Sequence, residues 1–103
     1  MTRRDLGAGY QMVQSAHAAT EFALDHPDLT EAWRERSRYM AVLTAQDETE
    51  LGHLARVAEE ESIPITRFYE PDIGDQLTAV AFGPLPRTRQ LLSNLPLAGG
   101  GTR

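Results

Sequence analysis

The sequence contains no cysteine and no lysine among its 103 residues. Without cysteine there can be no disulfide, no thiol nucleophile and no cysteine-ligated metal site. Without lysine there can be no Schiff base, no lysine general base and no Walker-type phosphate lysine. No apolar run approaches the roughly 18–20 residues that cross a bilayer, so we expect no contact with a membrane. No basic segment followed by an apolar stretch opens the sequence either, so we expect a cytoplasmic protein.

Positive charge is also scarce. Fifteen acidic residues oppose ten basic ones, all of them arginine, for a net charge of −5. A basic field suited to nucleic acid is therefore missing, and contact with RNA would need a local group of arginines. Arg34, Arg36 and Arg38 form such a group near two aromatic residues. Because these arginines are two residues apart, they would point to different sides of a helix. This favours a solvated surface over a binding site.

Apolar residues make up 41% of the chain, which is ordinary for a globular domain. Periodicity and breakers predict helices over residues 10–26, 31–36 and 47–61, a short helix after Pro86, and strands over residues 1–5, 39–44, 65–69 and 77–82. Strands that alternate with helices predict an α/β layer fold with a mixed sheet. We expect residues 1–96 to form a single domain and residues 97–103 a flexible tail.

Two helices carry stripes that predict their buried faces. In the first helix the apolar stripe, flanked by Val13, Phe22 and Leu24, comprises Met12, Ala16, Ala19 and Ala23. A separate polar stripe on the same helix comprises Gln14, His17, Glu21 and Asp25. In the helix over residues 47–61 the expected buried stripe comprises Leu51, Leu54, Ala55 and Ala58.

Tyr10, Gln14 and His17 are the first candidate site, because their spacing places them on one face of a helix. That helix follows a glycine-containing turn, so its free N–H groups could bind an anion. The alternative is structural: His17 packs against a neighbouring element, and Gln14 satisfies a loop carbonyl.

The loop over residues 70–76 is the second candidate site. It contains Glu70, Asp72 and Asp75, and Thr78 follows it. A carboxylate there could act as general base, and the Thr78 hydroxyl could donate to a developing oxyanion. A solvated acidic loop is the alternative. His26 and His53 have no metal-ligand spacing and no cofactor motif is present, so we expect neither a metal nor a cofactor.

Together these segments resemble the type 2 peptidyl-tRNA hydrolases, over residues 3–95. Arg4-Asp5-Leu6 with a glycine turn is similar to the start of that family. Residues 13–19, Val-Gln-Ser-Ala-His-Ala-Ala, resemble its Ala-Gln-x-x-His-Ala helix. Residues 78–84, Thr-Ala-Val-Ala-Phe-Gly-Pro, resemble its Thr-x-x-Ala-x-Gly-Pro ending.

The resemblance implies a three-layer α/β/α fold on a four-stranded mixed sheet, a homodimer, and metal-independent hydrolysis of the ester between a peptide and the 3′ end of tRNA. The family's threonine falls on Thr78, its aspartate on Asp72 with Glu70 as the alternative, and its glutamine and histidine on Gln14 and His17. In this hypothesis Asp72 is the base or positions the water, Thr78 stabilises the oxyanion, and Gln14 and His17 orient the site or the terminal adenosine.

Two departures from the family pattern keep other hypotheses open. The family's lysine falls at Tyr10, and the family has several apolar residues ahead of Arg-x-Asp-Leu where this sequence has Met-Thr-Arg. Either the chain starts further upstream or a short first strand is tolerated. The rival hypotheses are a binding module of the same fold that has lost its chemistry, and an esterase acting on a small substrate.

Overall fold

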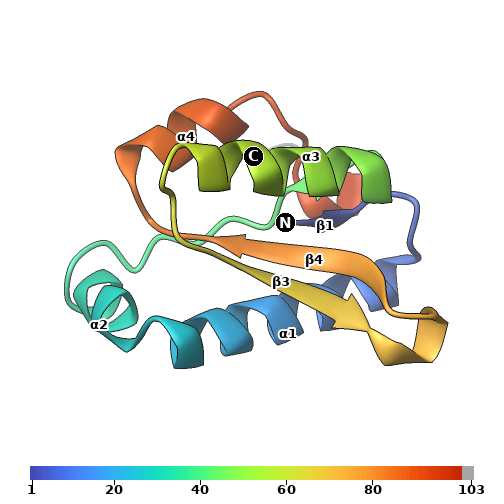
Figure 1. The fold of residues 1–103 in the computed structure, drawn as a ribbon, viewed down its shortest axis with the longest axis horizontal. Coiled ribbons are helices and arrows are strands. Elements are labelled where there is room, and N and C mark those ends of the chain that lie inside the picture. Colours follow the sequence, from blue (N-terminus) through green and yellow to red (C-terminus); the bar gives the residue numbers. More distant parts are fainter. Residues whose placement is uncertain (101–103) are drawn as a thin grey trace.

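A computed structural model describes residues 1–100 as a mixed sheet flanked by helices (Figure 1). The strands lie in the order β2-β1-β4-β3. Their bounds are Thr2–Arg3 for β1, Thr44–Ala45 for β2, Ile65–Glu70 for β3 and Gln76–Phe82 for β4. β1 runs parallel to β2 and antiparallel to β4, which in turn pairs antiparallel with β3. The predicted α/β fold with a mixed sheet is confirmed.

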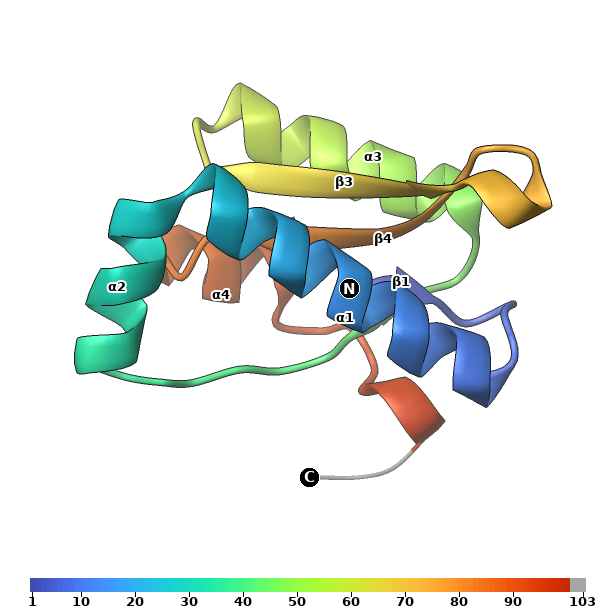
Figure 2. The ribbon, with the colours of Figure 1, turned by 90° about the horizontal axis from the view of Figure 1, so that it is seen from below.

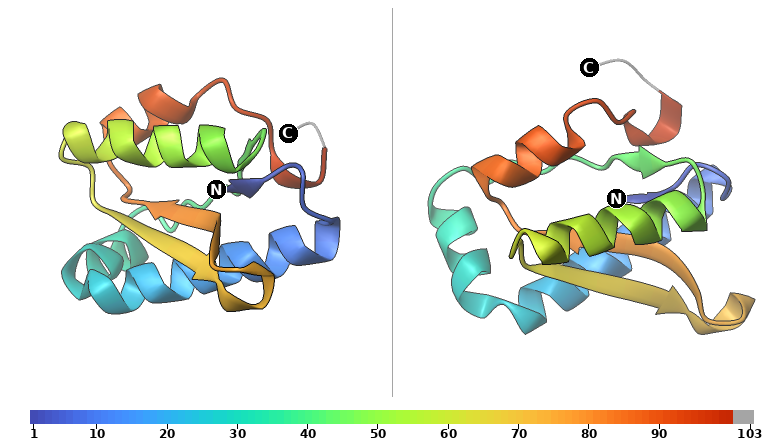
Figure 3. Two further views of the ribbon diagram at one scale, coloured as in Figure 1. Left: turned by 45° about the vertical axis from the view of Figure 1, so that its right-hand side comes forward. Right: turned by 45° about the horizontal axis from the view of Figure 1, so that its top comes forward.

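Helices cover both faces of this sheet. Their bounds are Ala8–Asp25 for α1, Pro27–Glu35 for α2, Glu48–Glu60 for α3 and Pro86–Leu92 for α4. In Figure 1, α1 and α2 lie below the strands while α3 and α4 lie above them. The two oblique views of Figure 3 show the same three layers. No helix in the described residues is both long and apolar enough to cross a membrane.

The core lies between α3 and the sheet, as the stripe over residues 47–61 predicts. Leu51, Ala55 and Ala58 are buried, and Leu51 packs in one cluster with Leu77 and Val80 of β4. The helix begins where Glu50 N donates to the Asp47 carboxylate at 3.0 Å. Such a cap contributes about 1 kcal/mol.

The predicted apolar stripe of α1 is not its buried face, although Phe22, on the flank of that stripe, is buried. The helix buries Gln14, Ala18 and Phe22. Met12 and Leu24, expected inside, are 72% and 73% exposed. The helix is rotated about its axis relative to the predicted orientation, so that Gln14 faces the sheet. Both ends of its amide find hydrogen-bond partners on the sheet, which offsets the cost of burying a polar side chain. Periodicity counts Gln14 as solvent-facing and cannot detect those partners.

The predicted first two strands are much shorter than expected. Of residues 1–5 only Thr2–Arg3 pair, and of residues 39–44 only Thr44 enters a strand, β2. Tyr39 and Met40 are 49% and 64% exposed, so the strand expected there is not formed. The physical reason is that β1, with two residues, gives residues 39–42 no hydrogen-bonding neighbour.

The remaining boundaries differ by a few residues. α1 begins at Ala8, so Gly9 lies inside its first turn rather than in a loop, and α2 begins at Pro27. Near the C-terminus, Leu97 bridges Leu43 and Ala98 N donates to Val42 O at 2.8 Å. These contacts tie down the beginning of the segment expected to be a flexible tail, while residues 101–103 lie outside the described part.

Candidate active site

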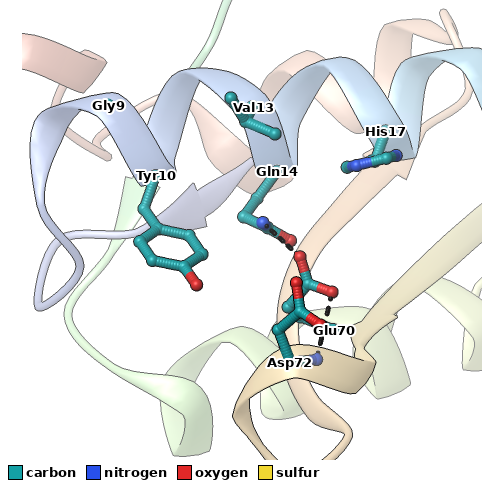
Figure 4. Close-up of a pocket in the computed structure, with 7 residues that line it drawn as sticks. All are labelled: Gly9, Tyr10, Val13, Gln14, His17, Glu70 and Asp72. Carbon is teal, nitrogen blue, oxygen red and sulfur yellow. Dashed lines mark hydrogen bonds between the residues drawn. The ribbon is translucent and has the colours of Figure 1, made fainter.

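A pocket of about 410 Å³ lies between the first half of α1 and the end of β3 (Figure 4). Its lining residues are Gly9, Tyr10, Val13, Gln14, His17, Glu70 and Asp72. Both candidate sites from the sequence contribute to it, although they are more than 50 residues apart in the chain. Thr78 is the one predicted site residue that does not line this pocket.

Gln14 links the two candidate sites. Its side chain is fully buried; Nε2 donates to Glu70 Oε1 at 2.9 Å, and Oε1 accepts from the Thr78 hydroxyl at 2.6 Å. An ionised carboxylate only accepts hydrogen bonds, so the amide nitrogen must face Glu70 and the oxygen must face Thr78. One hydrogen-bonded chain therefore joins β4, α1 and β3 and orients a carboxylate at the pocket.

Thr78 lies behind Gln14 rather than in the pocket. It has no exposed surface, because α1 covers this part of β4, and its hydroxyl proton is used on Gln14. Its carbonyl accepts from the Thr2 hydroxyl at 2.8 Å, which ties β4 to β1. The expected direct donation from Thr78 to an oxyanion does not fit this arrangement; the hydroxyl holds the Gln14 amide instead.

The two carboxylates that line the pocket differ in how they are held. Glu70 ends β3, is 8% exposed, and accepts from both Gln14 and the backbone N–H of Asp72 (3.4 Å). Asp72 lies in the short 3-10 turn Pro71–Ile73 and is exposed at the rim. Gly74 closes that turn with φ +73°, a left-handed conformation that suits glycine. Glu70 is thus the carboxylate with the fixed position.

His17 forms the far wall of the pocket. Its ring stacks on Phe68 with centroids 4.4 Å apart and planes 2° from parallel. Phe68 does not line the pocket but supports His17, and the sequence did not single it out. Its signal was available, because Phe68 and Glu70 are two apart on one strand and so share a face. The stack holds the imidazole flat against the sheet.

Tyr10, the residue on which the resemblance places the family's lysine, lies in the first turn of α1. Its ring is 42% exposed, and Figure 4 shows its hydroxyl directed toward the side of the pocket where Glu70 and Asp72 lie. No arginine is among the lining residues. Gly9 and Tyr10 of the lining lie in the first turn of α1, where the first N–H groups have no partner within the helix and carry partial positive charge.

Arg3 is bound elsewhere. It donates to both carboxylate oxygens of Asp5, at 3.0 and 2.9 Å, and to Gln76 Oε1 at 2.8 Å. The hydrogen bond from Arg3 holds the pKa of the Asp5 carboxyl below its usual value. This cluster fastens β1 to the start of β4 and leaves the Arg3 charge satisfied.

The arginine group near Trp33 does not converge on a site. Arg34 lies 3.5 Å from Glu31 on the surface, and Arg38 Nε donates to Arg34 O at 2.8 Å. In the described residues, no three histidine, cysteine or acidic side chains are grouped as a metal site would require.

These observations define an α/β domain whose pocket presents a positioned carboxylate, an amide and an imidazole. The family model "Peptidyl-tRNA hydrolase PTH2" matches residues 1–97, and the chain belongs to this family. The resemblance seen in residues 13–19 and 78–84 is thereby confirmed. No curated protein sequence matches the chain at a significant level.

Proposed function

We propose that the protein hydrolyses the ester between a peptide and the 3′ end of tRNA. Membership of the family supports a peptidyl-tRNA hydrolase-like function. The observation that carries the proposal for this chain is the hydrogen-bonded sequence Thr78–Gln14–Glu70, which ends at the pocket. Such a chain is expensive to bury unless every member is satisfied, and here it fixes the one buried carboxylate of the pocket.

In the proposed mechanism, Glu70 takes a proton from water as the water oxygen attacks the ester carbonyl. The tetrahedral intermediate then collapses, and the ribose oxygen leaves with the proton that Glu70 held, giving free tRNA and a peptide carboxylic acid that releases its remaining proton to solvent. The oxyanion receives the hydroxyl of Tyr10, while the buried Gln14 amide holds Glu70 in position. His17 bounds the space for the acyl or ribose group.

Asp72 is the alternative base, because it is exposed at the same pocket. A pair of isosteric substitutions separates the two carboxylates. Glu70→Gln should abolish cleavage if Glu70 is the base, whereas Asp72→Asn should then leave most of the rate. The reverse result would assign the base to Asp72.

The charge of the protein predicts a slow enzyme that binds tRNA weakly. No lysine or arginine lines the pocket, and the net charge of −5 opposes the phosphate backbone. Loss of a charged donor to the oxyanion costs on the order of 10²–10³ in rate.

We also expect a homodimer in the cytoplasm. Gel filtration at several concentrations would test the dimer, and cell fractionation would test the location.

The decisive experiment is single-turnover cleavage of an N-blocked aminoacyl-tRNA with the protein in excess, at low salt. The expected result is that the wild type releases free tRNA. The double variant, which carries both Glu70→Gln and Asp72→Asn, should release none. Equal release by the wild type and the double variant would contradict the proposal.

A binding module without chemistry is the second candidate function, and the absence of a cationic side chain in the pocket lining favours it. It predicts that tRNA binding survives in the double carboxylate variant. Its affinity should fall steeply with salt, as phosphate contacts require. Cleavage of a small acyl ester without tRNA binding would instead indicate an esterase with a small substrate.

A further inference from the structure

The pocket of the candidate active site carries negative charge that no neighbouring side chain balances. Glu70 and Asp72 both line it, and no arginine is among its lining residues. Glu70 accepts from the Gln14 amide and from the backbone N–H of Asp72, both neutral donors. Among the described residues, the Asp72 carboxylate itself has no hydrogen-bond or ion-pair partner. A cleft with charge of one sign attracts the opposite charge, so the pocket favours a ligand that brings a cation.

The two carboxylates lie at different depths of the pocket. Figure 2 shows the turn between β3 and β4, which carries Asp72, at the same end of the sheet as the first half of α1. Glu70, at the end of β3, is 8% exposed, whereas Asp72 is exposed at the rim. Figure 4 shows the two side chains next to each other, facing the α1 residues of the lining. A cation bound at the rim would therefore lie beside the group that activates water.

The α1 side of the pocket suits an aliphatic chain. Tyr10 and Val13 line it, are 42% and 52% exposed, and lie three residues apart on one helix face. A lysine side chain has a four-carbon apolar stem, which can lie along apolar surface while the ammonium stays at the solvent. A tyrosine ring also attracts a cation placed over its face. Tyr10 and Val13 thus offer contacts to the stem of a lysine, and Asp72 offers one to its ammonium.

We propose that the pocket selects substrates in which the peptide residue esterified to tRNA is lysine or arginine. This inference rests on the proposed function and names the substrate class of the same site. The cation pairs with Asp72, the stem lies on Val13 and Tyr10, and the ester carbonyl faces Glu70. The substrate then brings to the oxyanion the positive charge that the lining side chains do not supply. The same two carboxylates repel an acidic residue at this position.

Three esters of one tRNA test the selectivity. They carry Nα-acetyl-lysine, Nα-acetyl-norleucine or Nα-acetyl-glutamate, and norleucine keeps the aliphatic stem of lysine without its charge. We expect single-turnover cleavage of the lysyl ester to be about tenfold faster than that of the norleucyl ester, which is the lower range for a hydrogen bond to a charged group. The glutamyl ester should be the slowest. The advantage of lysine should shrink as salt is added, because Asp72 is exposed.

Two variants locate the source of the preference. Asp72→Asn should remove the preference for lysine over norleucine, measured as the ratio of the two rates. Asp75→Asn removes an equal charge from a neighbouring exposed position, but Asp75 does not line the pocket, so the ratio should stay as in the wild type. The left-handed backbone of Asp75, with φ +58°, is one that asparagine also adopts. An equal fall of the ratio in both variants would mean that net charge carries the preference, and would overturn the proposal.

Binding of two amides tests the pocket without chemistry. Nα-acetyl-lysinamide and Nα-acetyl-norleucinamide cannot release tRNA, and the NMR signals of Val13 and His17 in the lining report their binding. Tighter binding of the lysine amide with no cleavage of any ester would support the selectivity and contradict hydrolysis. Equal cleavage of the lysyl and norleucyl esters would overturn the selectivity and leave hydrolysis standing. Equal binding of the amides together with no cleavage would overturn both.

Discussion

The two halves of the sheet differ in how far their strands pair. On the β3–β4 side, seven-residue β4 pairs along its length with β3, and the polar Gln14 of α1 is buried with both ends bonded. On the β1–β2 side, each strand has two residues, and the neighbouring segment over residues 39–42 is exposed. The candidate active site belongs to the first side.

The difference teaches where precision is concentrated in this small fold. A catalytic carboxylate must be held in one position, and the Thr78–Gln14–Glu70 chain does this only because α1, β3 and β4 are packed together. The short ladder of β1 and β2 bears no residue of the candidate site. Matched substitutions on the two sides can measure this contrast.

The largest expected effect comes from a leucine of equal burial on each side. Leu77 of β4 is 6% exposed, and Leu43, beside β2, is 8% exposed. Leu77→Ala should lower the free energy of unfolding by about 2–5 kcal/mol. Leu43→Ala should cost about 1 kcal/mol less, because Leu43 lines a mainly apolar groove of about 1370 Å³ and so has fewer neighbours to lose. Urea unfolding measures both, and a larger loss for Leu43→Ala would remove the contrast.

The second effect concerns chemistry at the well-packed side. Tyr10→Lys returns a cationic donor to the first turn of α1, so we expect the single-turnover rate of ester cleavage to rise about 10²–10³-fold. Val13→Lys adds the same charge to the same pocket, about one helical turn further along α1. It should raise the rate less than about tenfold. An equal gain in both variants would show that charge alone, and not the position at residue 10, limits the rate.

The parts of the fold that local pattern decides were predicted from the sequence. The α3 stripe and the β3–β4 pair follow from periodicity and from the turn between Glu70 and Gln76. The orientation of α1 was not predictable in this way, since it depends on partners for Gln14 that lie more than 50 residues away. The strand expected over residues 39–44 failed for a related reason: its apolar sequence favours a strand, but a strand needs a neighbour.

The sequence predicted which residues line the pocket better than it predicted how they are arranged. Tyr10, Gln14, His17, Glu70 and Asp72 do line one pocket, and their catalytic and binding roles stay predictions. The position of Thr78 behind Gln14 could not be read from spacing, because both side chains are polar and either could have faced the pocket. Phe68 was missed because an aromatic residue in a strand is ordinarily read as core.

A third, smaller effect comes from two buried threonines. Thr78→Val removes the donor to Gln14 Oε1 and leaves that oxygen buried without a partner, which should cost about 1–3 kcal/mol. Thr44→Val removes only a 3.4 Å contact with Pro96 O, which already accepts from Thr44 N, and should cost less than about 0.5 kcal/mol. Thr78→Val should also lower kcat more than it changes KM, which a purely structural role would not predict. Equal stability losses would contradict the contrast.

The smallest expected effect is the pH dependence of the Arg3–Asp5 pair, the polar tie of the short β1. Because the bond from Arg3 lowers the pKa of Asp5 in the folded state, its contribution is present above the ordinary value of 3.8 and is lost as pH falls through the lowered folded value. The Asp5 side chain is 43% exposed, so solvent screening limits this contribution to less than about 1 kcal/mol. Asp5→Asn should therefore reduce unfolding free energy slightly at about pH 7 and not at about pH 2.

Glu31→Gln, which removes the exposed contact with Arg34, is the matched control and should have no effect at pH 7. A loss for Asp5→Asn that is the same at both pH values would show that the amide is worse for packing, and that the ion pair contributes nothing to holding β1 against β4.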